Sequence, residues 1–346
     1  MNEIFSKKII NWYDKFGRKN LPWQGSNSYY VWVSEIMLQQ TQVIKVIDYF
    51  QHFIQQFPTL KALAESDIDN VLSCWSGLGY YNRARNLHKS AQICLEKYNA
   101  CLPVNITQLL ELPGIGRTTA GAILSLASDL PYPILDGNVK RVMSRLFTVK
   151  AEKTSELNHK LWDCVTQLMP NSHCRKYNQA LMDLGSLICT RSSPNCKQCP
   201  LINNCKAYKK DIVSLYPQKN KKTKQIKKTY HLIMLVNQNK IFLEQRESHG
   251  IWPQLWFLPM YNSEQELLTA ALNRFNINQN SFKFNIQHIL THRKLDLQVH
   301  CYSNVSIIEK NINKHNKWVN ISNYADLPHP TSLVKIIHNY LANEIN

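Results

Sequence analysis

The chain has 346 residues, enough for two domains at roughly 100–200 residues each. Hydrophobic residues make up 44% of it and aromatic residues 10%, which excludes a largely disordered chain. Its 41 Lys and Arg residues against 24 Asp and Glu residues give a net charge of +17, which favours nucleic acid as a partner ahead of an acidic membrane surface.

Two absences in the sequence suggest where the protein acts. No stretch approaches 18 consecutive apolar residues, so we expect no transmembrane helix. The first residues form no apolar segment typical of a secretory signal, so we expect a cytoplasmic protein that does not bind membranes.

Residues 1–216 show apolar positions at helical spacing, which predicts an all-α domain. The expected helices are 31–50, 60–80, 84–98, 118–128, 137–148 and 157–169. Glu35 lies on the first of them, with Trp32 and Gln39 on the same helical face. A carboxyl partly desolvated by such neighbours has a raised pKa and suits a general acid, although a lone helical glutamate is more often simply solvated.

A glycine-containing turn, Leu-Pro-Gly-Ile-Gly-Arg-Thr-Thr-Ala at 112–120, joins two expected helices. Gly114 and Gly116 allow a tight hairpin, and a helix that starts near Arg117 would point backbone N–H groups at an anion. Such a hairpin can bind a DNA phosphate without reading a base, whereas the simpler interpretation is a plain turn between packed helices.

Asp136 stands before Gly-Asn-Val-Lys-Arg, where another helix is expected to begin. Judged alone, this aspartate is most simply a helix N-cap, worth about 1 kcal/mol.

Four cysteines fall within seventeen residues: Cys189, Cys196, Cys199 and Cys205. The spacing Cys-x6-Cys-x2-Cys-x5-Cys supplies four local thiolates, which suit a metal site. Zinc modules more often pair two short Cys-x2-Cys knuckles across a spacer, so the spacing favours an iron–sulfur cluster, with zinc and free buried thiols as alternatives.

The charge then divides the chain. Residues 1–216 carry +9, residues 217–228 carry six lysines and no acid, and residues 229–346 carry +2. The lysine-rich segment predicts an interdomain linker, either a solvated tether or an arm that touches phosphates. Strands expected at 231–236, 240–243 and 295–302, with helices at 267–275 and 332–342, predict an α+β second domain.

The hairpin followed by the four cysteines resembles the helix–hairpin–helix DNA glycosylases that carry a [4Fe-4S] cluster. Four further blocks resemble the MutY-type adenine glycosylases of that superfamily: LPWQ at 21–24, VWVSEIMLQQTQ at 31–42, GLGYY at 77–81 and ILDGNVKR at 134–141. The resemblance covers almost all of residues 1–210. It implies a base-excision repair enzyme that hydrolyses the N-glycosidic bond of adenine mispaired with 8-oxoguanine or guanine in double-stranded DNA, acting as a monomer in the bacterial cytosol near the nucleoid.

The resemblance also implies roles for individual residues. Glu35 would protonate the adenine ring, Asp136 would stabilise the oxocarbenium-like sugar, and Asn138 would position the sugar or the attacking water. The adenine pocket would be lined by Trp23, Gln24 and Gln179. The residues expected against the orphaned 8-oxoguanine are Gln40, Thr41, Leu78 and Tyr80, with Tyr80 intercalated.

Thr118 distinguishes two branches of the superfamily. The endonuclease III type has a lysine at this position, which forms a Schiff base and permits strand cleavage. Threonine cannot do so, and the sequence therefore predicts a monofunctional glycosylase that leaves an abasic site. The alternatives are an endonuclease III-like lyase acting on oxidised pyrimidines and a non-catalytic DNA-binding protein of the same fold.

The resemblance extends to the second domain, where the family carries a Nudix-like domain that recognises 8-oxoguanine. The acidic Nudix box is absent from residues 229–346, so we expect no nucleotide hydrolysis there. Where the family has a Phe-Ser-His loop, this chain has Leu290, Thr291 and His292. Thr291 retains a hydroxyl that could reach the lesion.

Overall fold

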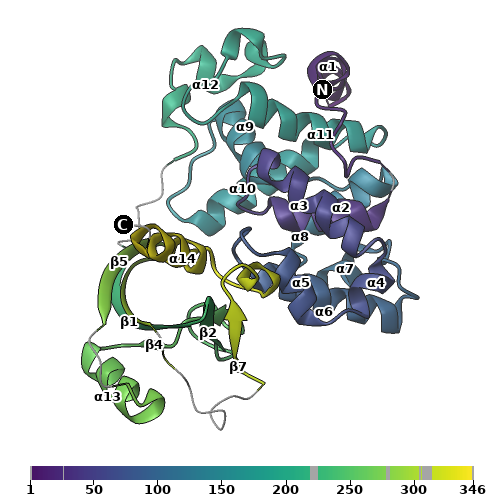
Figure 1. Ribbon diagram of the computed structural model, residues 1–346. Coiled ribbons are helices and arrows are strands. Elements are labelled where there is room, and N and C mark those ends of the chain that lie inside the picture. Colours follow the sequence, from purple (N-terminus) through teal and green to yellow (C-terminus); the bar gives the residue numbers. More distant parts are fainter. Residues whose placement is uncertain are drawn as a thin grey trace. The chain divides into compact units, whose positions relative to one another are not determined.

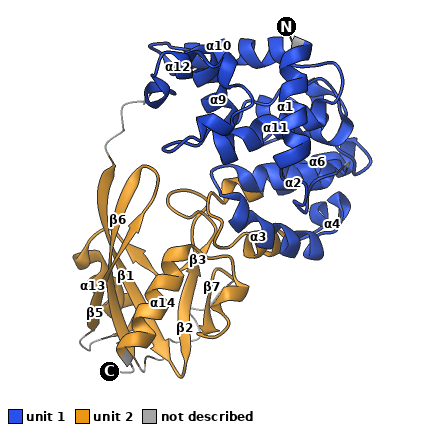
Figure 2. Ribbon diagram, turned by 90° about the horizontal axis from the view of Figure 1, so that it is seen from above, with its two compact units in different colours: residues 1–66, 85–221 blue, residues 67–84, 222–346 orange. Residues whose placement is uncertain are grey.

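The computed structural model describes residues 2–25, 27–218, 225–277, 281–303, 305 and 314–344. They divide into two compact units, a first unit of residues 1–66 and 85–221 and a second unit of residues 67–84 and 222–346 (Figure 2). The first unit is helical and the second contains a mixed sheet, which confirms the expected fold class. Residues 67–84 group with the second unit, whereas the sequence predicts that they belong to the helical domain.

Only helices and their connections precede the sheet in the described part of the chain (Figure 1). They are α1 (Asn2–Phe16), α2 (Ser28–Leu38), α3 (Val43–Gln56), α4 (Leu60–Ala64), α5 (Ile68–Cys74), α6 (Asn82–Lys97), α7 (Ile106–Leu110), α8 (Arg117–Ala122), α9 (Gly137–Phe147), α10 (Thr154–Leu168), α11 (Cys174–Asp183) and α12 (Lys206–Lys209). π-Helical turns extend α8 over Ile123–Ala127 and α11 over Leu184–Ile188. No helix among the described residues is both long enough and apolar enough to cross a membrane.

Two of the expected helices are interrupted. The predicted helix 31–50 is two helices, α2 and α3, because Gln40 adopts a left-handed conformation with φ of 59°. The predicted helix 60–80 is α4 and α5 followed by a turn. Apolar spacing continues through both breaks, so periodicity alone could not locate them. Helices α1 and α11 were not among the predicted elements.

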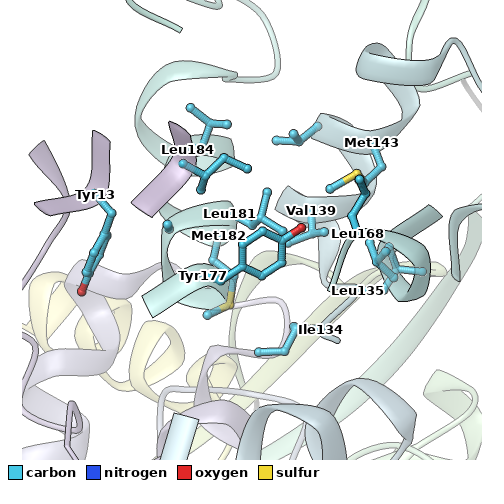
Figure 3. Packing of buried hydrophobic residues seen from close by; sticks show 14 of the residues in the cluster. Tyr13, Ile134, Leu135, Val139, Met143, Leu168, Tyr177, Leu181, Met182 and Leu184 are labelled. Carbon is cyan, nitrogen blue, oxygen red and sulfur yellow. The ribbon is translucent and has the colours of Figure 1, made fainter. Parts of the chain in front are cut away.

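One hydrophobic cluster of the first unit fixes the segment before Asp136. Ile134 and Leu135 are fully or almost fully buried against side chains from α1, α9 and α11. Figure 3 shows them beside Val139, Tyr177 and Leu181. Since the two preceding residues are anchored, the Asp136 backbone has little freedom to move.

The sheet of the second unit has the order β3-β2-β1-β6-β5, with β4 paired to β1 and β7 paired to β2. Its strands are β1 (Ile226–Asn237), β2 (Lys240–Gln245), β3 (Trp256–Phe257), β4 (Met260–Tyr261), β5 (Phe282–Ile289), β6 (Arg293–Ser303) and β7 (Asn316–Asn320). β1 and β6 run parallel, and the other pairs are antiparallel. Strands β5 and β7 were not predicted from the sequence.

The two faces of β1 pack against different helices. Leu232 and Met234 join a cluster with α14 (Thr331–Glu344), while Ile233 and Leu235 join a cluster with α13 (Glu264–Phe275). This alternation has the period of two expected for a strand and places the helices on opposite faces of the sheet (Figure 1).

The lysine-rich segment is only partly described. Residues 219–224 lie outside the described residues. Strand β1 begins at Ile226, so the last three residues of the expected linker belong to the sheet, where they pair with β6.

Candidate active site

Glu35 lies near the C-terminal end of α2, a helix whose N-cap is Asn27. The Asn27 side chain accepts hydrogen bonds from the backbone N–H groups of Tyr29 and Tyr30 and so caps the helix. Glu35 is partly buried, and burial raises the pKa of its carboxyl from 4.5 to about 8, with a further upward contribution from the negative charge of Asp136. The helix thus holds a carboxylic acid that is mostly protonated at neutral pH.

Asp136 is the N-cap of α9, as the simpler sequence interpretation predicted. Its Oδ1 accepts a hydrogen bond from the Val139 backbone N–H at 2.7 Å, and its Oδ2 accepts one from Asn138 Nδ2 at 3.0 Å. Burial raises the Asp136 pKa, and these hydrogen bonds oppose that increase. Folding therefore brings together two carboxyl groups in different environments, an arrangement suited to one acid and one carboxylate.

Two arginines of α9 connect this capped end to the cysteine loop. Arg141 donates to Asn138 Oδ1 at 2.9 Å, to the Gly185 carbonyl at 2.6 Å and to the Cys189 carbonyl at 2.7 Å. Arg145 donates to the carbonyls of Thr190 and Arg191, and to Cys189 Sγ at 3.3 Å. Neither side chain stands out as a candidate site residue in the sequence, although their i, i+4 spacing puts both on one face of α9.

The four cysteines line one small cavity of about 30 Å³, together with Arg145. Folding thus brings the predicted ligands to one place. Within the described part of the chain, no three or more His, Cys, Asp or Glu side chains are arranged to hold a single metal ion.

The hairpin before α8 has the predicted form. The helix begins at Arg117 with Gly116 as its N-cap, and Gly114, Gly116 and Arg117 are all exposed. Only Gly114 needs to be glycine for conformational reasons, because its φ is +81° whereas that of Gly116 is −95°. The Arg117 guanidinium lies 4.0 Å from the centre of the Trp162 ring.

Thr118 is the second residue of α8. Its hydroxyl donates a hydrogen bond to the Leu135 carbonyl at 3.3 Å. This bond ties the hairpin helix to the residue that precedes Asp136.

A pocket of about 440 Å³ brings together the three residues expected to bind adenine, Trp23, Gln24 and Gln179. Val31, one helical turn before Glu35, also lines it. Trp23 is 6% exposed and packs edge-on against Phe50.

The side-chain amide of Gln24 forms hydrogen bonds with the backbone of residues that precede it. Its Oε1 accepts from the Leu21 backbone N–H at 3.1 Å, and its Nε2 donates to the Arg18 carbonyl at 2.8 Å. Gln24 therefore shapes the wall of the pocket, and its amide is already engaged with the backbone.

The residues expected against the orphaned base differ in exposure. Gln40 is exposed, Thr41 is partly buried, and Leu78 is only 6% exposed, as expected for a residue that packs in the fold. Tyr80 is 46% exposed and, like Gln40, has a left-handed backbone, with φ of 51°. Non-glycine residues in this conformation are uncommon and cluster at functional sites.

Within the second unit, Tyr80 contacts the loop expected to read the lesion. Its hydroxyl lies 2.7 Å from Thr291 Oγ1, in the turn between β5 and β6. His292 shares that turn, and its carbonyl accepts a hydrogen bond from the Ile226 backbone N–H. Arg83, which the sequence analysis missed, lies over the Tyr80 ring at 5.5 Å and donates to the Gly79 carbonyl at 3.0 Å.

The chain is similar to known DNA repair proteins in sequence and in fold. Residues 33–167 match the family model of the HhH-GPD superfamily base excision DNA repair proteins, and residues 231–339 match that of the NUDIX domain. Among solved structures, a thermostable thymine-DNA glycosylase covers 60% of this chain and 97% of its own with a TM-score of 0.55 and 26% identity. An endonuclease III in complex with DNA covers 61% of this chain and 98% of its own with a TM-score of 0.51, and at 22% identity it shows the fold alone.

Relatives by sequence extend over both units. The adenine DNA glycosylase of Buchnera aphidicola subsp. Baizongia pistaciae is 40% identical over 338 residues, which is 96% of each chain. The adenine DNA glycosylase of Homo sapiens is 39% identical over 214 residues, 59% of this chain and 39% of its own. The similarity to adenine DNA glycosylases extends over nearly the whole chain and includes both family models. This chain therefore belongs to the adenine DNA glycosylase family.

Proposed function

We propose that this protein, a DNA glycosylase of base excision repair, removes adenine mispaired with 8-oxoguanine or guanine in duplex DNA and leaves an abasic site. The observation that carries the proposal is the pair of Glu35 and Asp136. One carboxyl has a pKa near 8, the other accepts two hydrogen bonds, and a pocket lined by Val31, one helical turn before Glu35, has room for a base.

The two carboxyl groups divide the chemistry. Glu35, protonated at neutral pH, donates its proton to a ring nitrogen of adenine as the glycosidic bond lengthens. Asp136 remains the carboxylate of the pair because its oxygens accept from Val139 N–H and Asn138 Nδ2. Its negative charge then stabilises the oxocarbenium-like sugar. Asn138, anchored by Arg141, positions the sugar or the attacking water.

Thr118 supports a reaction that stops at the abasic site. A strand-cleaving lyase of this superfamily needs an amine at this position, whereas the Thr118 hydroxyl donates to the Leu135 carbonyl. The position where a lyase would carry its nucleophile thus holds a hydroxyl that is hydrogen-bonded to the residue before Asp136.

Cys189, Cys196, Cys199 and Cys205 would hold a [4Fe-4S] cluster. Their convergence on one cavity, with an Arg145 N–H directed at Cys189 Sγ, fits a thiolate-ligated group, and the Cys-x6-Cys-x2-Cys-x5-Cys spacing favours a cluster over zinc. When bound, the cluster cross-links the loop that Arg141 and Arg145 join to α9.

The second unit would read the lesion through Tyr80, Thr291 and His292, with Tyr80 intercalated beside 8-oxoguanine. The 2.7 Å contact between the two hydroxyls supports this assignment. Gln40 and Thr41 would contact the same base. The first unit would form the glycosylase domain and the second unit the lesion-reading domain of a monomer that acts on cytoplasmic DNA.

Excision from a duplex with one 8-oxoguanine:adenine pair tests the function. Product strands are expected only after alkali, because the enzyme itself leaves the backbone intact. Glu35→Gln should bind this duplex with unchanged affinity and lose at least a hundredfold in single-turnover excision, the lower range of general-acid contributions. Full activity in Glu35→Gln, or strand scission without alkali, would contradict the mechanism.

A further inference from the structure

Asp183, a residue that the proposed mechanism does not use, lies behind the adenine pocket. Its side chain is fully buried, and Arg18 holds it from two sides. The Arg18 backbone N–H donates to Oδ2 at 2.7 Å, while its Nε and Nη2 donate to Oδ1 at 3.0 Å and 2.5 Å. A carboxylate bound this way has one fixed orientation.

Asp183 also accepts a hydrogen bond from the pocket residue Gln179. Gln179 Nε2 donates to Asp183 Oδ1 at 3.1 Å across one turn of α11. An ionised carboxylate can only accept, so the end of the amide that faces it must be the NH2 group. The chemistry of the pair therefore fixes which way the Gln179 amide is turned.

The consequence is that Gln179 presents an acceptor to the pocket. Asp183 engages one of the two hydrogens on Nε2, so Oε1, the only acceptor of this side chain, lies at the other end of the amide from the carboxylate. Gln179 lines the pocket. Neutral adenine carries only one hydrogen-bond donor once it is attached to the sugar, the exocyclic N6 amino group.

We propose that Asp183 is a positioning residue that makes the pocket select a 6-aminopurine over a 6-oxopurine, by locking Gln179 with Oε1 toward the base. This inference rests on the proposed adenine excision. Hypoxanthine carries a carbonyl at position 6, so its oxygen would face Oε1, acceptor against acceptor. Sites built to hydrogen-bond one group reject the analogue that lacks it, because a polar atom is left unpaired.

The test compares single-turnover excision of adenine and of hypoxanthine, each opposite 8-oxoguanine. Asp183→Asn offers both a donor and an acceptor and no longer dictates the amide orientation. The adenine-to-hypoxanthine ratio is expected to fall about tenfold, the value of one hydrogen bond. Gln179→Met, which removes the acceptor without touching the bond between Arg18 and Asp183, should lower the ratio by a similar factor.

Ser186→Ala is the matched control, because it removes a hydroxyl that accepts from Arg18 at 3.0 Å and donates to the Asp183 backbone carbonyl, while the hydrogen bonds of the Asp183 carboxylate remain. It should keep the wild-type ratio. If Asp183 only supports the fold, Asp183→Asn will slow both substrates equally, and an unchanged ratio would overturn the inference while leaving adenine excision intact. If the wild-type protein excises no adenine, the proposed function itself fails.

Discussion

Burial of the Glu35 carboxyl keeps it protonated for catalysis, but it also makes the folded state less stable when the carboxyl is ionised. Its pKa of about 8 in the folded chain, against 4.5 ordinarily, means that the folded state holds the proton more tightly than the unfolded state between these two values. The stability contributed by this group is therefore present at low pH and is lost as the pH rises through about 8.

Glu35→Gln should remove that pH dependence, because glutamine stays neutral. Above pH 8 the variant is expected to unfold at a higher temperature than the wild type, by roughly 2–4 °C for each kcal/mol gained. Near pH 5 the two should converge. Thermal unfolding at both pH values measures this, with Glu111→Gln at an exposed position as the control for loss of a surface carboxylate. If the variant is no more stable than the wild type above pH 8, the pKa of Glu35 is not raised by burial as described.

The same pKa sets the pH dependence of excision. Because the proton on Glu35 is the one transferred, the single-turnover rate should be level at neutral pH and should fall as the pH rises past about 8. Rates measured from pH 6 to 9.5 would show this descending limb. A rate that rises through pH 8 would instead indicate that Glu35 acts as a base.

At the scale of single elements, the hairpin before α8 separates two glycines that look alike in the sequence. Gly114 has a φ of +81°, and a Cβ there would stand 2.8 Å from Asn86 Cβ. Gly116 has a φ of −95°, and a Cβ there meets nothing within 4 Å. One glycine is required by the turn, and the other leaves the backbone open to a phosphate.

Gly114→Ala should lower the free energy of unfolding by about 1–3 kcal/mol, the cost of a residue held in a disfavoured backbone region. Gly116→Ala should lower it by less, about 0.5–1 kcal/mol, because alanine is a poorer N-cap than glycine but its Cβ would meet no neighbouring atom. Denaturant unfolding of both variants provides a matched comparison. An equal loss in the two would show that the left-handed turn is not what constrains Gly114.

At the scale of the whole molecule, Tyr80 and Thr291 meet although 211 positions separate them in the chain. Nothing in the sequence around either residue indicates that they are in contact, and each lies in a turn. Their contact exists because residues 67–84 and the β5–β6 turn belong to the same compact unit.

If that contact reads the lesion, Tyr80→Phe and Thr291→Ala should each reduce the preference for 8-oxoguanine:adenine over guanine:adenine several-fold. The double variant should lose little more than either single one, because residues in contact share their interaction energy. Ratios of single-turnover rates on the two duplexes measure this, with Thr269→Ala on α13 as the control. Additive losses would show that the two hydroxyls act separately.

The sequence by itself determined the fold class and the family, because the hairpin, the cysteine spacing and the ILDGNVKR block are local patterns. It also located the N-cap at Asp136, which depends only on neighbouring residues. Expectations that needed long-range information were weaker. The helix predicted over 31–50 breaks at Gln40, and residues 67–84 join the second unit, because apolar spacing does not encode which surface a segment finally packs against.

Only the tertiary structure decided how these residues work together. The pKa of Glu35 depends on burial and on a carboxylate about a hundred positions away in the chain, neither of which a helical pattern specifies. Likewise, Gln179 was expected in the pocket, but the direction of its amide follows from Asp183 and Arg18. Charge states and hydrogen-bond directions are set by neighbours in space, and so they emerge only when the chain is folded.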